Sequence, residues 1–198
     1  MLDIGANTGQ FALELRYDMG YAGRIISFEP TSGAFSILKK AANSDPLWNV
    51  YNYALGDKDE MTSINISENS LSSSLAEMLP SHVELEPKSK YIGQETICLK
   101  SLDSLFPSLC VTAKNIYMKI DTQGFEEKVL RGAKVSLCKI DTIQMEMSLV
   151  PLYKNEMLFN DMCVLMNNRG YTLIGIENGF TDPTSGHLLQ VDGIFRRS

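Results

Sequence analysis

Near the start of the chain, two glycines and two acids are spaced to bind a ligand that carries a ribose. The segment DIGANTG (residues 3–9) reads as the end of a strand followed by a turn containing Gly5 and Gly9. Glycine in such a turn lets a ligand approach the backbone, and the following helix offers free N–H groups. Glu29 ends the next apolar run, where an acid can accept hydrogen bonds from ribose hydroxyls.

The glycine spacing favours a nucleoside without phosphates. The turn reads Gly-x-x-x-Gly and lacks one glycine of the G-x-G-x-x-G pattern that admits a pyrophosphate. S-adenosylmethionine is a ligand of this kind, and Asp3 is placed to take its ammonium group, directly or through water. An ordinary α/β domain can also carry glycine at its first turn and an acid at a strand end. The turn alone does not decide between the two interpretations, and Glu29 favours an adenosyl ligand.

Further acids lie at predicted strand ends on the same side of the fold. Methyl transfer to an alcohol needs a positioned acceptor and a group that takes its proton. Asp121 ends a strand and is the first candidate for this base or for a hydroxyl anchor, with a helix N-cap as the alternative. Glu146, inside an otherwise apolar strand, is the second candidate. Glu126 could act in the site or only favour the first turn of its helix, and Lys119 is expected to pair with an acid.

The elements that must position these residues alternate between strands and helices. Such alternation predicts βαβ units and therefore an α/β fold with a mostly parallel sheet. The last two runs are separated by a segment without a helical pattern, so they are expected to form an antiparallel hairpin. The expected strands are 1–4, 23–30, 49–55, 116–121, 142–147, 171–177 and 191–197, and the expected helices are 7–19, 32–43, 123–137 and 158–168.

Residues 61–94 interrupt this alternation. The stretch from Ser67 to Ser74 is polar and turn-prone, so the segment is expected to be an irregular insertion. It is either a surface excursion or a lid on the substrate side. With no internal repeat and no second compositional block, the chain is expected to form one domain over residues 1–198.

Composition narrows the function classes. The 198 residues carry a net charge of −6 without a basic run, which disfavours nucleic acid as a partner. No apolar stretch is long enough for a membrane span. The 4 cysteines form no C-x-x-C pair and the 2 histidines lie far apart, so no zinc site is expected. Several carboxylates leave assistance by a metal open, but none has the spacing of a defined metal site. The unpaired cysteines predict a cytoplasmic location. His187 is expected on the surface.

Taken in order, the motifs resemble those of the FkbM-type S-adenosylmethionine-dependent methyltransferases over nearly the whole chain. The matching segments share the family's order, although each is weak alone. They are DIGANTG (3–9), FEP (28–30), NYALGD (52–57), SSL (73–75), SLD (101–103), KIDTQGFE (119–126), VLRGA (129–133), MEMS (145–148), PLY (151–153) and QVDGIF (190–195).

This resemblance implies a Rossmann-like class I methyltransferase fold with a seven-stranded sheet whose first strand is truncated here. It implies O-methylation of a small-molecule or carbohydrate hydroxyl, such as that of a sugar, glycolipid or metabolite. A homodimer is one candidate assembly of the chain. The chain also has no Asn/Asp-Pro-Pro-Tyr/Phe turn, which is common in amino-methylating enzymes. The residues expected to bind the cofactor are Asp3, Gly5, Asn7, Gly9, Glu29, Pro30, Ala54, Leu55 and Asp121.

Two other functions compete with this one. A nicotinamide-dependent oxidoreductase would share the turn and the ribose-binding acid, but the chain has neither the third glycine nor a Tyr-x-x-x-Lys pair. A catalytically inactive binding module that keeps the fold is the other alternative. The acids at positions 3, 29 and 121 argue against it.

Overall fold

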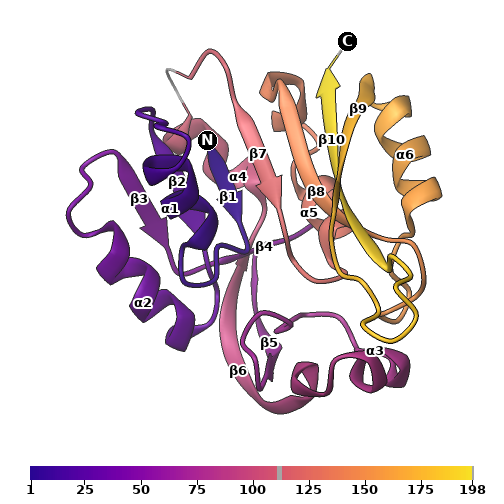
Figure 1. Ribbon diagram of the computed structural model, residues 1–198. Coiled ribbons are helices and arrows are strands. Elements are labelled where there is room, and N and C mark those ends of the chain that lie inside the picture. The colour runs from indigo at the N-terminus through magenta and orange to yellow at the C-terminus, as the bar shows by residue number, and fades with distance from the viewer. Residues whose placement is uncertain (111–112, 198) are drawn as a thin grey trace.

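The computed structural model describes residues 1–110 and 113–197, and its centre is a seven-stranded sheet (Figure 1). The strands follow the order β3-β2-β1-β7-β8-β10-β9. Their bounds are β1 (Leu2–Ile4), β2 (Ile25–Phe28), β3 (Trp48–Tyr51), β7 (Tyr117–Ile120), β8 (Thr142–Ser148), β9 (Tyr171–Asn178) and β10 (Gln190–Arg197). The predicted fold class is confirmed.

Strand direction follows the predicted pattern. The pairs from β3 through β8 are parallel, whereas β10 is antiparallel to both β8 and β9. β1 has only three residues, yet it pairs with β2 on one side and with β7 on the other. The order of the strands reverses at β1, which in open α/β sheets is where ligands bind, at the carboxyl ends of the strands.

Helices pack on the sheet because each has one apolar stripe. α1 (Gln10–Tyr17) and α2 (Ser32–Ala42) bury Ala12 and Leu38 against β2 and β3. The larger core lies under α4 (Leu102–Leu109), α5 (Glu126–Gly132) and α6 (Phe159–Asn168), which cover β1, β7, β8 and β10. Within the described residues, no helix combines the length and apolar character needed to cross a bilayer.

Three predicted elements differ from the structure. The strand expected over 49–55 is two strands, because the chain leaves the sheet at Asn52, whose side chain donates to the carbonyls of Glu29 and Pro30. The second piece, β4 (Ala54–Leu55), belongs to another sheet. The helix expected over 123–137 divides into α5 and a 3-10 turn, and α1 begins three residues later than predicted, after Gly9.

The prediction that 61–94 is irregular is wrong. β5 (Glu60–Ser67) and β6 (Tyr91–Lys100) pair antiparallel and form a three-stranded sheet with β4. Ile64, Ile97 and Leu99 form its small core, against which Phe125 packs. Between the strands lie a serine-rich loop (residues 68–79), α3 (Pro80–Leu85) and a 3-10 turn (Pro87–Ser89). In Figure 1 this part lies beyond the carboxyl ends of the parallel strands, away from both termini.

A contact between two glycines joins the small sheet to the main core. α5 ends at Gly132, where an added Cβ would lie only 1.7 Å from the carbonyl oxygen of Gly56. Gly56 directly follows β4, and its N–H donates to Lys100 in β6. The helix and the small sheet therefore meet backbone to backbone.

Candidate functional site

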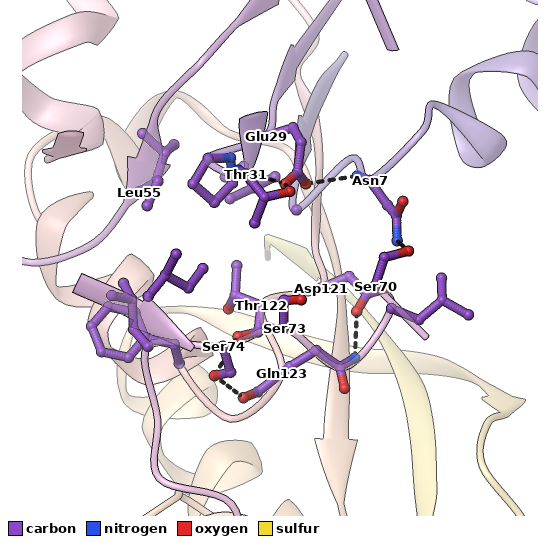
Figure 2. A pocket seen from close by; sticks show the side chains of 18 of the residues that line it. Asn7, Glu29, Thr31, Leu55, Ser70, Ser73, Ser74, Asp121, Thr122 and Gln123 are labelled. Atoms are coloured by element: carbon purple, nitrogen blue, oxygen red, sulfur yellow. Dashed lines mark hydrogen bonds between the residues drawn. The ribbon is translucent and has the colours of Figure 1, made fainter. Parts of the chain in front are cut away.

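A cavity lies at the switch point of the sheet, between the main sheet and the small one. Its walls come from the turns after β1, β2 and β7, from β4 and β5, and from the serine-rich loop (Figure 2). The lining residues are Ile4, Gly5, Asn7, Glu29, Pro30, Thr31, Tyr53, Ala54, Leu55, Ile64, Ser70, Leu71, Ser73, Ser74, Leu75, Asp121, Thr122, Gln123 and Phe125. Seven of the nine residues predicted to bind the cofactor are among them.

The turn after β1 is shaped by Gly5, but for a different reason than the one expected. Gly5 has φ +82°, and a Cβ there would stand 1.8 Å from the carbonyl oxygen of Asp121. The space beside this glycine thus belongs to the turn after β7 and not to a ligand. The N–H groups of Gly5 and Ala6 both donate to the carbonyl of Phe28. The absence of a side chain at Gly5 therefore allows the ends of β1, β2 and β7 to contact one another directly.

Glu29 is buried at the mouth of the cavity and organises two loops. Its Oε2 accepts from the backbone N–H of Asn7 at 2.9 Å. Its Oε1 accepts from the N–H of Thr31 at 2.9 Å and from the Thr31 hydroxyl at 2.6 Å. Burial raises the pKa of this carboxyl, while the bonds from Thr31 and Asn7 oppose the rise. A carboxylate oxygen has two acceptor sites, so Glu29 keeps capacity for a ligand hydroxyl.

Asn7 carries a buried acceptor that no described residue satisfies. Its backbone lies in the left-handed region, with φ 46°, and its Nδ2 approaches Ser70 Oγ at 3.5 Å. The Oδ1 atom has no hydrogen-bond partner within the described chain. Buried polar groups are rarely left unpaired, so this oxygen marks a place for a donor such as the ammonium or a hydroxyl of a nucleoside ligand.

The far end of the cavity is apolar. Ala54 and Leu55 of β4 lie there together with Ile64, Leu75 and Phe125. The side chains of Phe28, Tyr51 and Tyr53 stack in sequence beside it, with ring centroids 5.6 Å and 6.1 Å apart. A flat aromatic base fits such a slot, and Glu29 at the polar end suits the attached ribose. The residues present therefore fit an adenosyl ligand.

Two predicted cofactor residues lie outside the cavity wall. Asp3 is buried within β1, in register with Ser27 and Lys119, and accepts from Ser27 Oγ at 2.9 Å. Burial raises its pKa to about 6. Gly9 has φ +95° and faces the core, where a Cβ would meet Trp48 at 2.9 Å. Direct contact of either residue with a ligand in the cavity is therefore not favoured by the geometry.

Asp121 follows β7 and lines the cavity as predicted. Lys119 Nζ lies 2.7 Å from its Oδ2, which confirms the expected ion pair, and Gln123 Nε2 donates to its Oδ1 at 2.9 Å. The ammonium of Lys119 and the amide of Gln123 lower the pKa of Asp121 against the opposing effect of burial. Both carboxylate oxygens are thus engaged, and Asp121 is a weak proton acceptor. Its expected alternative role as a helix N-cap is wrong, since Phe125 takes that position.

Glu146 lies on β8 beside Asp121 and is linked to it through Gln123. Its Oε2 accepts from Gln123 Nε2 at 2.8 Å and from Gln190 Nε2 at 2.8 Å. Burial and the neighbouring carboxylates of Asp121, Glu126 and Asp192 raise its pKa well above the usual value. Both hydrogen bonds that described residues donate to this carboxylate end on Oε2, which leaves Oε1 with capacity to accept. Glu146 itself is not among the residues that line the cavity, whereas its neighbours Asp121 and Gln123 are.

The other acids have different surroundings. Glu126 Oε1 accepts from the N–H of Thr122 at 2.8 Å and from its hydroxyl at 3.0 Å, which closes the turn before α5. Burial raises the pKa of Glu126 to about 7. Asp192 of β10 pairs with Glu146 of β8 in the sheet register. Burial is the main cause that raises the pKa of Asp192. His187 is exposed, as predicted.

Sequence reasoning missed the residues that connect these acids. Gln123 was not singled out, although its position next to a glycine after a strand end suggested a turn. Tyr153 donates from its hydroxyl to Gln123 Oε1 at 2.9 Å, and it comes from a distant part of the sequence. The Ser70–Leu75 loop also contributes to the cavity wall, and Ser74 Oγ donates to the Gln123 carbonyl at 2.6 Å.

A second cavity, of about 730 Å³, lies over the face of the sheet formed by β7, β8 and β10, beside α1. Lys119, Gln144 and Asp192 are among its lining residues. Lys119 connects the two cavities, because its ammonium reaches Asp121 in the first. In the part of the chain that the structure describes, no group of three or more His, Cys, Asp or Glu side chains is arranged to hold a metal ion.

Comparison with known proteins agrees with this geometry. The family model described as the methyltransferase FkbM domain matches residues 3–173. A crystal structure of the methyltransferase FkbM from Methylobacillus flagellatus KT is 14% identical with a TM-score of 0.55, over 98% of this chain and 42% of that one. A putative tRNA (m1A22) methyltransferase from Streptococcus pneumoniae is 10% identical with a TM-score of 0.51, over 100% of this chain and 63% of that one.

The chain thus spans less than two thirds of the length of either structural neighbour, and at these identities the likeness concerns the fold alone. A search of curated proteins found no match. The family model is the stronger evidence, because it covers most of the chain, including the turns that carry Glu29 and Asp121 and the strand that carries Glu146. The chain belongs to the FkbM methyltransferase family.

Proposed function

We propose that this chain is an S-adenosylmethionine-dependent O-methyltransferase acting on a hydroxyl of a sugar, glycolipid or small metabolite. The observation that carries the proposal is the cavity at the switch point, with a polar end at Glu29 and Asn7 and an apolar end at Leu55 and Phe125. It adjoins the pair of acids Asp121 and Glu146, which are joined by one amide.

The residues suited to hold the cofactor divide by chemistry. Glu29 accepts from the ribose hydroxyls, and Asn7 Oδ1 gains the donor that it lacks. Pro30, Ala54 and Leu55 border the adenine, while Gly5 shapes the turn and Asp121 lies toward the reactive end. Asp3 acts indirectly, through the charge it places beneath Lys119. When bound, S-adenosylmethionine supplies a methyl group on a positively charged sulfur.

Glu146 is the base that we favour, ahead of Asp121. An alcohol becomes a good nucleophile as its proton leaves, and a raised pKa makes a carboxylate a better proton acceptor. Oε1 of Glu146 takes that proton from the acceptor hydroxyl. Asp121, already neutralised by Lys119, anchors a hydroxyl of the acceptor and balances charge near the site. Glu126 holds the turn on which Asp121 and Gln123 lie.

Carbohydrate or other polyhydroxylated acceptors suit the acids around this site, since carboxylates accept hydrogen bonds from hydroxyls. A phosphate-rich acceptor is disfavoured by the same charges and by the net charge of −6. We further propose that residues 1–198 work as one domain, because both sheets contribute to the cavity, and that the chain functions in the cytoplasm, alone or as a homodimer.

Calorimetric titration with S-adenosylhomocysteine tests the cofactor, with NADH as the matched control. The proposal expects micromolar affinity for the first and none for the second. Binding of NADH alone would replace the proposal with an oxidoreductase. Binding of S-adenosylhomocysteine without turnover of any hydroxylated acceptor would favour an inactive binding module.

A further inference from the structure

The amide of Gln123 bridges the two carboxylates of the site. One side-chain nitrogen donates to Asp121 Oδ1 at 2.9 Å and to Glu146 Oε2 at 2.8 Å. An amide NH₂ group has two N–H donors, so each carboxylate receives one of them. Two negative groups that would otherwise repel each other are thereby held side by side.

The orientation of this amide is set from its other end. Tyr153 donates its hydroxyl to Gln123 Oε1 at 2.9 Å, so the NH₂ group must face the acids. The Tyr153 side chain is almost fully buried, and burial strongly raises its pKa, so it remains a donor throughout the physiological range. If the amide turned over, its oxygen would face two carboxylates, which is electrostatically unfavourable.

The backbone supports the same orientation. Gln123 has φ +56° and Gly124 has φ +86°, a left-handed pair that is uncommon outside glycine. A Cβ at Gly124 would lie 2.7 Å from the Tyr153 ring, so the ring packs directly on this turn. Ser74 Oγ donates to the Gln123 carbonyl at 2.6 Å from the loop that lines the cavity. Strained residues held by several independent contacts are typical of functional sites.

We infer that Gln123, oriented by Tyr153, is a positioning residue that holds Glu146 by Oε2 so that Oε1 is the oxygen that receives the acceptor's proton. The inference rests on the proposed function, in which Glu146 is the base. Gln190 shares the task by donating to the same Oε2 atom at 2.8 Å. Neither glutamine exchanges a proton itself, and the proton passes from the hydroxyl to Glu146 Oε1.

The charged groups that act on Glu146 are known, so its titration can report this arrangement. Asp121, Glu126 and Asp192 raise its pKa, and Lys119 lowers it. A donor to the ionised carboxylate also lowers its pKa, and losing one such hydrogen bond is expected to raise the pKa by about 1 unit or more. The ¹³C resonance of the glutamate side-chain carboxyl measures this directly and needs no methyl acceptor.

The chain offers a matched control for each variant. Gln144 lies on the same strand as Glu146 and accepts from the Tyr117 hydroxyl at 2.6 Å while its amide donates to Glu177 at 3.3 Å. Gln144→Met and Tyr117→Phe therefore remove the same types of bond from a neighbouring tyrosine–glutamine–glutamate chain. The test variants are Gln123→Met and Tyr153→Phe, the second of which keeps the packed ring.

The experiment titrates the assigned Glu146 carboxyl in wild type and in the four variants, with amide spectra to confirm folding. Gln123→Met is expected to raise the Glu146 pKa by about 1 unit or more, and Tyr153→Phe to raise it by a smaller amount. The two control variants should shift it by less than the matching test variants, since Gln144 acts on Glu146 only through its bond to Asp192. An unchanged pKa in Tyr153→Phe and Gln123→Met, or an equal shift in the controls, overturns the inference.

Binding of S-adenosylhomocysteine to the same samples separates the two proposals. If wild type binds it and the Glu146 pKa does not respond to Gln123→Met, the inference fails and the proposed function stands. If the pKa responds as expected but wild type binds no S-adenosylhomocysteine, the hydrogen-bond arrangement is supported and the proposed function fails.

Discussion

Replacing Gly5 by alanine should destabilise the protein far more than the same change at Gly20. Both glycines have positive φ, +82° and +67°, so an alanine at either pays a left-handed cost of about 1–2 kcal/mol. At Gly20 nothing lies within 4 Å of the new Cβ. At Gly5 the new Cβ would stand 1.8 Å from the Asp121 carbonyl oxygen.

The size of the extra loss follows from that contact. Real Cβ atoms essentially never approach closer than 3.0 Å, and the obstructing atom here is main chain, which cannot rotate away. The turn after β7 must move, which strains the Asp121 N–H bond to the Ile4 carbonyl, 2.9 Å long. Overpacking of this kind costs about 1–3 kcal/mol, and the upper end applies, so Gly5→Ala should lose about 4 kcal/mol in total.

Urea unfolding of wild type, Gly5→Ala and Gly20→Ala measures this difference. Thermal unfolding of the same samples is a second measurement. The loss of about 4 kcal/mol in Gly5→Ala should lower the melting temperature by about 8–16 °C for a chain of this size, and Gly20→Ala should lower it by about 2–8 °C. Equal losses of unfolding free energy in the two variants would show that the close approach of Gly5 to the Asp121 carbonyl does not affect stability. S-adenosylhomocysteine affinity should also fall in Gly5→Ala, because the displaced turn carries Asp121.

Four further outcomes are expected. The folded pKa of Asp3, about 6, lies above its unfolded value, so its contribution to stability is present below pH 4 and is lost as pH rises to 6. Asp3→Asn should therefore flatten the decline of unfolding free energy over that window, by about 3 kcal/mol in urea titrations at several pH values. Glu29→Gln should weaken S-adenosylhomocysteine binding by about 1.5–3 kcal/mol in calorimetry, and an unchanged affinity would remove Glu29 from the site. Lys119→Met should cost about 1–3 kcal/mol at pH 7 by removing the cation beside Asp121, and adding Asp121→Asn should recover part of the loss in a double-mutant cycle. Gly33→Ala, in α2 with open space around its Cβ, should raise the unfolding free energy by about 0.4–1 kcal/mol.

The parallel sheet was predictable because its strands are short apolar runs between helical patterns. Glu29 and Asp121 were predictable for a related reason, since acids at strand ends converge where the strand order reverses. The same reasoning failed for Asp3, which is one residue too early. Asp3 lies inside β1, where its carboxylate accepts from the Ser27 hydroxyl of β2, whereas Ile4 and Gly5 at the end of the strand reach the cavity.

The parts that sequence reasoning missed depend on contacts between distant segments. Gln123 gains its role only because Tyr153 and Glu146 approach it from elsewhere in the chain. The strands β5 and β6 were missed because the serine-rich loop between them suggested irregular structure for the whole segment. Ile64 and Ile97 alternate with polar neighbours, yet their burial depends on Phe125 from the turn before α5.

The glycine contact between α5 and the small sheet restricts how the cavity can open. Because the main chains of Gly132 and Gly56 are in direct contact, we do not expect the three-stranded sheet to move as a hinge at this junction. Gly56 continues directly from Ala54 and Leu55, so the apolar wall of the cavity is anchored to the helix. The apolar wall of the cavity is therefore expected to keep its position relative to α5 when a ligand binds.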